Sequence, residues 1–236
     1  MTKLRYFCVT FNAQIQPWEI PLFRGAIIQK VGMEHEWYHN HDNNAPQKPA
    51  FHYRYPLIQY KTNHKKQPMI LCLHESIEDI HAFFRQQDWS IELKGKPIKM
   101  SIEELNLQEF DLRVNPQSDT YQIQNWIALN QDNFREYHAI RSLTQKILYL
   151  ESKLTGHILA FATGVDWKIE DRLQVEITEL LGMRNANFKG QRMETFSLRF
   201  NCNAFLPNYI GLGKGSSMGF GVVKKRYKGV KESRYE

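Results

Sequence analysis

The sequence predicts an α+β fold made of two tandem units with the same order of elements, and three observations support this. In the first half, segments with strand and helix periodicity follow one another in the order β-α-β-β-α-β. The second half contains a strand, a long helix and further strands. The 236 residues are 42% hydrophobic and 13% aromatic, a globular composition with enough apolar residues for a core.

The elements of the first half follow from a hydrophobic period of about two residues in strands and about 3.6 in helices. They are strands at 3–13, 53–61 and 68–74, helices at 18–31 and 75–89, and a further strand or hairpin at 90–100. The apolar residues at helical spacing in the first helix are Ile20, Phe23, Ile27 and Ile28. This order is that of a ferredoxin-like (RRM-like) domain, which we place at residues 1–115.

The second half predicts a degenerate second ferredoxin-like domain, residues 119–236. Residues 114–119, VNPQSD, have the composition of a linker. The elements that follow are a strand at 120–128, a long helix from about residue 131, and strands near 173–180 and 194–205. The residues that step by three or four along the helix, and so predict its core face, are Tyr137, Ile140, Leu143, Ile147, Leu150 and Leu154.

Charge and cysteine content narrow the class of protein. The net charge of +6 favours an acidic partner such as nucleic acid, although a solvated surface explains the same charge. The three cysteines, Cys8, Cys72 and Cys202, form no C-x-x-C pair, which suits a reducing compartment and burial as small hydrophobic residues. We expect a cytoplasmic protein that does not contact a membrane, because the sequence shows neither a signal peptide nor a membrane-spanning stretch.

Residues 35–39, HEWYH, match the zinc-peptidase signature H-E-x-x-H, in which two histidines of one helix bind zinc and the glutamate acts as base. That helix would have to continue past His39, but the residues that follow include the turn-forming or helix-ending types Asn40, Asp42, Asn43, Asn44 and Pro46. The metzincin continuation that would supply a third histidine ligand is absent, and no glutamate occurs between Asp42 and His74. We therefore predict no metal site and keep the zinc peptidase as a remote alternative.

His39 and His41 flank Asn40 in the same stretch. Two imidazoles this close in sequence can act as general base and general acid in one reaction, because a histidine pKa near 6.5 leaves both protonation states accessible at neutral pH. Two solvated loop histidines are the alternative, and this segment alone does not exclude them.

A glycine-rich stretch, NYIGLGKGSSMGFGVVKKRYK, occupies residues 208–228. It is not a P-loop, because Lys214 precedes a glycine, and too few residues follow Gly221 for a dinucleotide-binding unit. Glycines let backbone N–H groups approach phosphates, and the lysines, arginine and serines add cations and hydroxyls. The predicted binding residues are Gly211, Gly213, Lys214, Gly215, Ser216, Ser217, Gly219, Gly221, Lys224, Lys225 and Arg226. A glycine-rich hairpin without a ligand is the alternative.

The motif GLGKGSSMGFG resembles the C-terminal glycine-rich loop of the CRISPR-associated RAMP superfamily. The whole chain resembles the b-subtype of the sixth Cas family, endoribonucleases that cut CRISPR repeat precursors into guide RNAs. Blocks similar to that subtype, in the same order, are FRGAI at 23–27, HNH at 39–41, YRYPLIQYK at 53–61, NWIALNQ at 125–131 and NYIGLGKG with MGFGVV at 208–223. The glycine-rich loop marks only the superfamily, and the HNH and YRYPLIQYK blocks narrow the resemblance.

The resemblance implies two ferredoxin-like domains and RNA cleavage without a metal or other cofactor, leaving a 5′-hydroxyl and a 2′,3′-cyclic phosphate. It places the catalytic pair at His39 and His41 and makes CRISPR repeat precursor RNA the partner. Effector-complex subunits and a second copy of the chain are further partners to test. It assigns no role to His35, and Lys48, Arg54 and Lys61 are merely near the pair in sequence. An RNA-binding RAMP subunit without catalysis remains an alternative.

Overall fold

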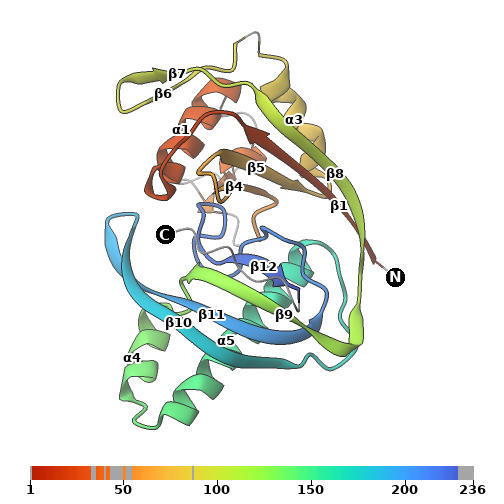
Figure 1. The fold of residues 1–236 in the computed structure, drawn as a ribbon, viewed down its shortest axis with the longest axis vertical. Helices are drawn as coiled ribbons and strands as arrows, with labels where there is room; N and C mark the ends of the chain where they lie inside the picture. The colour runs from red at the N-terminus through yellow and green to blue at the C-terminus, as the bar shows by residue number, and fades with distance from the viewer. Residues whose placement is uncertain are drawn as a thin grey trace.

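The computed structural model describes residues 2–32, 36–39, 41–42, 50–51, 55–86 and 88–227. Two four-stranded antiparallel sheets dominate it, each with helices on its outer side (Figure 1). The C-terminal part of the chain passes between the two sheets in this view. No helix in the described ranges combines the length and apolar composition that a membrane span requires.

The first sheet has the strand order β4-β5-β1-β8, and all neighbouring strands run antiparallel. Its strands are β1 (Thr2–Phe11), β4 (Ile58–Thr62), β5 (Pro68–Leu73) and β8 (Ile102–Leu112). Helix α1 (Ile20–Val31), after the 3-10 turn η1 (Pro17–Glu19), connects β1 towards β4, and α3 (Ser76–Phe84) connects β5 towards β8. This is the ferredoxin-like arrangement, and it confirms the predicted fold class of the first unit.

Of the strand or hairpin predicted at residues 90–100, the hairpin is present, but these residues do not supply the last strand of this sheet. They form a separate hairpin of β6 (Ile91–Leu93) and β7 (Lys96–Ile98), and the last strand is β8. Strand β8 pairs with β1 along almost its whole length, from Thr2↔Leu112 to Phe11↔Ile102. The sequence pattern missed β8, an outer strand on which only Leu112 is buried, because its apolar alternation is interrupted: Leu105 and Leu107 are out of phase with Phe110 and Leu112.

The second sheet has the order β10-β11-β9-β12, the same order as the first when the strands are numbered within each unit. Its strands are β9 (Val114–Trp126), β10 (Val175–Phe188), β11 (Gln191–Ala204) and β12 (Val222–Arg226). Helices α4 (Gln131–Ala139) and α5 (Leu143–Gly164) lie between β9 and β10. Between β11 and β12, where the first unit has a helix, the chain forms the glycine-rich segment, residues 205–221.

Two expectations for the second half are corrected. Residues 114–119 are the first part of β9 rather than a linker, because β11 pairs with them at Ala204↔Val114 and Cys202↔Asp119. The long helix is two helices, because Ile140 adopts an extended backbone and the side chain of Ser142 caps a new helix by accepting from Gln145 N. Because of this break, the helical spacing of core residues does not continue from α4 into α5.

The break between α4 and α5 changes which of the predicted residues face the core. Tyr137, Leu150 and Leu154 are buried as predicted, but Leu143 is 70% exposed. The division into domains 1–115 and 119–236 stays a prediction, since β8 and β9 follow one another with Arg113 between them.

The core lies in two layers on the two faces of the first sheet. Side chains alternate along β1: Phe7 and Val9 pack against α1 and α3, while Tyr6 and Cys8 join the core of the second unit. The two units therefore share one continuous apolar cluster. All three cysteines are free and buried, as the sequence predicts.

Candidate functional site

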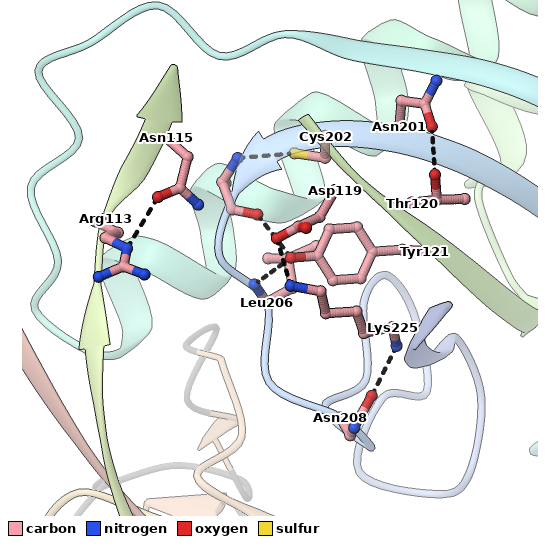
Figure 2. A network of polar contacts seen from close by, with 11 residues as sticks. Arg113, Asn115, Asp119, Thr120, Tyr121, Asn201, Cys202, Leu206, Asn208 and Lys225 are labelled. Carbon is pink, nitrogen blue, oxygen red and sulfur yellow. Dashed lines mark hydrogen bonds and ion pairs between the residues drawn. The ribbon is translucent and has the colours of Figure 1, made fainter. Parts of the chain in front are cut away.

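The base of the glycine-rich segment is held by a polar network on β9 and β12 (Figure 2). The Tyr121 hydroxyl donates to Ala204 O and accepts from Leu206 N, both at 3.1 Å. Further along, Asn208 Oδ1 accepts from Lys225 N at 2.7 Å. These bonds fix the start of the segment relative to the second sheet.

The segment then crosses to the first unit and lies along β4, an outer strand of the first sheet. Three successive β4 residues hold it: Gly211 N donates to Gln59 Oε1 at 2.9 Å, Tyr60 N donates to Ser217 O at 3.0 Å, and Lys61 Nζ donates to Ser216 O at 2.5 Å. The segment thus bonds to backbone and side-chain groups of an outer strand, whose unpaired backbone groups could otherwise pair with another chain.

The glycines of the segment are required by contacts within the protein. At Gly213, where φ is +81°, a Cβ would lie 2.7 Å from Trp126 Nε1, and at Gly219, where φ is +83°, 2.5 Å from Ile20 Cδ1. At Gly221, also with positive φ, a Cβ would overlap the Leu212 carbonyl oxygen. Side chains are excluded here by packing and by backbone conformation. The predicted approach of a phosphate to these glycines stays a prediction.

Lys61 is the least expected residue of the site. Its side chain is 0% exposed, and burial lowers the pKa of its ammonium group from 10.5 to about 7. Sequence reasoning placed it only near the histidines, because nothing local indicates that the loop it contacts lies 155 residues further along the chain.

The predicted cations of the segment and of β12 have different surroundings. Lys214 is exposed, with Nζ 5.4 Å from the centre of the Phe188 ring. Burial and the neighbouring Arg226 lower the pKa of Lys224. Lys225 Nζ forms a 2.7 Å ion pair with Asp119, so its charge is partly neutralised within the protein.

The histidine stretch contains α2 (Glu36–His39), β2 (His41–Asp42) and β3 (Ala50–Phe51), with β2 and β3 paired antiparallel. The backbone of His39 ends α2, as the turn-forming residues after it predict, and the backbone of His41 begins β2. Their side chains lie outside the description, as do His35, Lys48 and Arg54.

Tyr60 connects the histidine stretch with the glycine-rich segment. Its hydroxyl donates to Tyr38 O at 3.4 Å, and Tyr38, the residue before His39, is buried with its own hydroxyl donating to Asp79 O at 2.9 Å. The backbone of Tyr60 holds Ser217, as described above. The two stretches singled out in the sequence are therefore attached to the same residue of β4.

Comparisons with known proteins agree with this architecture. The Cas6b N-terminal domain family matches residues 2–111, and the Cas6b C-terminal domain family matches residues 113–226. A Methanocaldococcus jannaschii protein of uncharacterised function is 36% identical over 101 residues, which are 43% of this chain and 67% of that protein.

Two solved structures have the same fold over almost the whole chain. A Cas6b crystal structure has a TM-score of 0.85 at 25% identity, covering 95% of this chain and 100% of the other. A structure described as the CRISPR RNA processing endoribonuclease Cas6b has a TM-score of 0.72 at 22% identity, with the same coverage. Because the two family matches together extend from residue 2 to residue 226, the chain belongs to the Cas6b family of CRISPR-associated proteins.

Proposed function

We propose that this protein is an endoribonuclease that cuts CRISPR repeat precursor RNA into guide RNAs without a metal ion. Membership of the Cas6b family supports RNA processing, and one relative of the same fold is described as a CRISPR RNA processing endoribonuclease. The observation that carries the proposal is the position of Tyr60, which bonds to both the histidine stretch and the glycine-rich segment. A catalytic pair and a loop that binds the same RNA would have to be held close together, and Tyr60 holds the two stretches in this way.

The proposed chemistry is attack by the RNA's own 2′-hydroxyl on the adjacent phosphorus. A base removes the 2′-hydroxyl proton, the bond from phosphorus to the 5′-oxygen breaks, and an acid protonates that oxygen. The products are a 2′,3′-cyclic phosphate and a 5′-hydroxyl. His39 and His41 take the two roles, in an order that pH profiles of single variants would assign.

Binding is assigned to the glycine-rich segment and β12. Lys214 is the exposed cation of the segment, and Lys224 and Arg226 lie on the strand that follows. Cations that neutralise phosphates release counterions, so affinity for repeat RNA should fall as salt concentration rises. Effector-complex subunits and a second copy of the chain are further proposed partners, to be tested by size-exclusion chromatography with and without RNA.

The experiment that tests the proposal changes one oxygen atom of the RNA. A 2′-deoxy nucleotide just upstream of the scissile phosphate removes the nucleophile but keeps the phosphates and the other riboses. We expect cleavage to stop, binding to persist and the modified strand to inhibit competitively. Incubation of the unmodified repeat in EDTA, with analysis of the product ends, provides the second arm.

Each alternative gives a different result. A metal-activated water needs no 2′-hydroxyl and loses activity in EDTA, so cutting of the 2′-deoxy strand with a linear 3′-phosphate or a 5′-phosphate would contradict the histidine mechanism. A non-catalytic RAMP subunit would bind the repeat and leave the unmodified strand intact.

A further inference from the structure

Lys61 is a buried charge with no charged partner among the described residues. The only interaction that its side chain makes there is the hydrogen bond to Ser216 O, and burial is the only cause of its lowered pKa. A buried ammonium group without a carboxylate lowers the free energy of unfolding. A charge kept at such a cost, directly beneath the glycine-rich segment, indicates a function.

The peptide groups next to Lys61 turn their carbonyls inward. Gly215 O accepts from Met218 N at 2.8 Å and from Phe220 N at 3.4 Å, and Ser216 O accepts from Lys61 Nζ. The described chain has no cis peptide bond, and the C=O and N–H groups of a trans peptide point in opposite directions. The N–H groups of Ser216 and Ser217 therefore point away from these anchors.

Of these two N–H groups, that of Ser217 is open to a ligand, because Ser217 is half-buried, whereas Ser216 is 5% exposed. Neither donates to an acceptor within the described ranges, and the residue before them, Gly215, has a φ of +76°. Successive backbone N–H groups in turns of this kind form anion-binding concavities. A cation bonded to the Ser216 carbonyl polarises the peptide group that carries the Ser217 N–H and makes it a stronger donor.

We propose that Lys61 is a positioning residue for RNA binding, which holds the Ser216 carbonyl inward so that the Ser217 N–H group binds an RNA phosphate. The proposal rests on the proposed function, that the glycine-rich segment binds RNA. It adds a residue from the first unit to a binding site that the sequence places wholly in the second.

The lowered pKa makes the proposal testable by pH. A phosphate bound near Lys61 favours its protonated form, so affinity should fall as pH rises past about 7. The other titratable groups of β4 and of the elements packed on it are Tyr60, Cys72 and Tyr209, whose pKa values burial raises, and the cations Arg24, Lys30 and Lys214. Tyr60 and Cys72 stay neutral and Arg24 stays charged across the range in which Lys61 titrates.

The test compares Lys61→Met with Lys65→Met. Methionine keeps the length and apolar stem of Lys61 but removes the ammonium group, whereas Lys65→Met removes the same charge from an exposed position four residues on. Dissociation constants for the uncleavable 2′-deoxy repeat are measured near pH 6 and near pH 8.5. We expect Lys61→Met to weaken binding about tenfold near pH 6 and less near pH 8.5, and Lys65→Met to differ little from wild type at either pH.

The outcomes separate this inference from the proposed function. Equal affinity of Lys61→Met and wild type, or a loss that does not change with pH, overturns the role of Lys61. If Lys214→Ala also binds normally, RNA binding by the segment fails as well; if Lys214→Ala is weaker, only the inference fails. Should Lys61→Met not fold, calorimetry of wild type near pH 8 in two buffers decides: proton uptake on RNA binding is expected, and its absence overturns the proposal.

Discussion

The two units share one strand order and differ in the connection between their third and fourth strands. In the first unit, α3 leads from β5 towards β8 and covers the sheet; in the second, the glycine-rich segment connects β11 with β12. The segment leaves the second sheet and bonds to β4 of the first unit (Figure 1). The same topology therefore carries a packed helix in one copy and, in the other, the loop to which we assign RNA binding.

This difference between the two connections indicates where a ferredoxin-like fold can acquire a binding site. A connection that is not a helix leaves backbone N–H groups outside regular structure, where they can bind a ligand. A helix satisfies those groups internally. The second unit lacks one helix, and its sheet is covered instead by α4 and by the long α5, whose buried residues include Leu150 and Leu154.

The largest expected effect is on the cleavage rate, and it separates catalysis by the first unit from RNA binding by the second. His39→Ala and His41→Ala should each lower the single-turnover rate about 10²–10⁴-fold without changing affinity for the repeat, because each removes one proton-transfer group. Lys214→Ala should weaken affinity for the repeat without changing the single-turnover rate. His35→Ala serves as control and should cleave at nearly the wild-type rate. Wild-type rates in both His39 and His41 variants would contradict this division.

The second prediction compares glycines with positive φ in the two units. Gly221→Ala places a Cβ on the Leu212 carbonyl oxygen, whereas Gly95→Ala, in the β6–β7 hairpin at φ +75°, meets nothing within 4 Å. We expect Gly221→Ala to lower the free energy of unfolding by about 2–4 kcal/mol and Gly95→Ala by about 1 kcal/mol. Urea unfolding measures both. Equal losses would show that packing of the glycine-rich segment adds nothing to backbone strain.

The third prediction concerns the contact between the units through Lys61. The unfolded chain keeps the Lys61 proton towards pH 10.5, whereas the folded protein loses it near pH 7. The folded state thus binds fewer protons between these values, and the free energy of unfolding rises with pH there, by up to about 1.4 kcal/mol per pH unit. Lys61→Met should lack this rise, and Lys65→Met should keep it. Identical slopes in wild type and Lys61→Met would contradict a buried, titrating lysine.

The smallest effect concerns ion pairs at equivalent places. Each unit has one between its first and last strands: Lys3–Glu109, with side chains 63% and 50% exposed, and Asp119–Lys225, at 32% and 24%. Because solvent screens exposed pairs, Lys3→Met should change the free energy of unfolding less than Lys225→Met, which should lower it by about 1 kcal/mol. Thermal unfolding at low and high salt tests the order, and a larger loss in Lys3→Met would reverse it.

The sequence by itself determined the features that depend on local pattern. Apolar residues at helical spacing place α1, and Ile20, Phe23 and Ile27 are buried as that spacing requires. The order of strands and helices predicts the ferredoxin-like class. The glycine-rich loop indicates the superfamily, and the HNH and YRYPLIQYK blocks indicate the family that the comparisons confirm.

Only the tertiary structure decided the features that depend on distant partners. Pairing with β1 fixes β8, whose own alternation is interrupted, and residues 114–119 are extended because β11 pairs with them, although their composition is that of a linker. The Lys61–Ser216 bond joins residues 155 positions apart, and no pattern along the chain encodes such a contact. Pairing and burial are properties of the assembled sheets, so the binding role proposed for Lys61 became visible only when both units were in place.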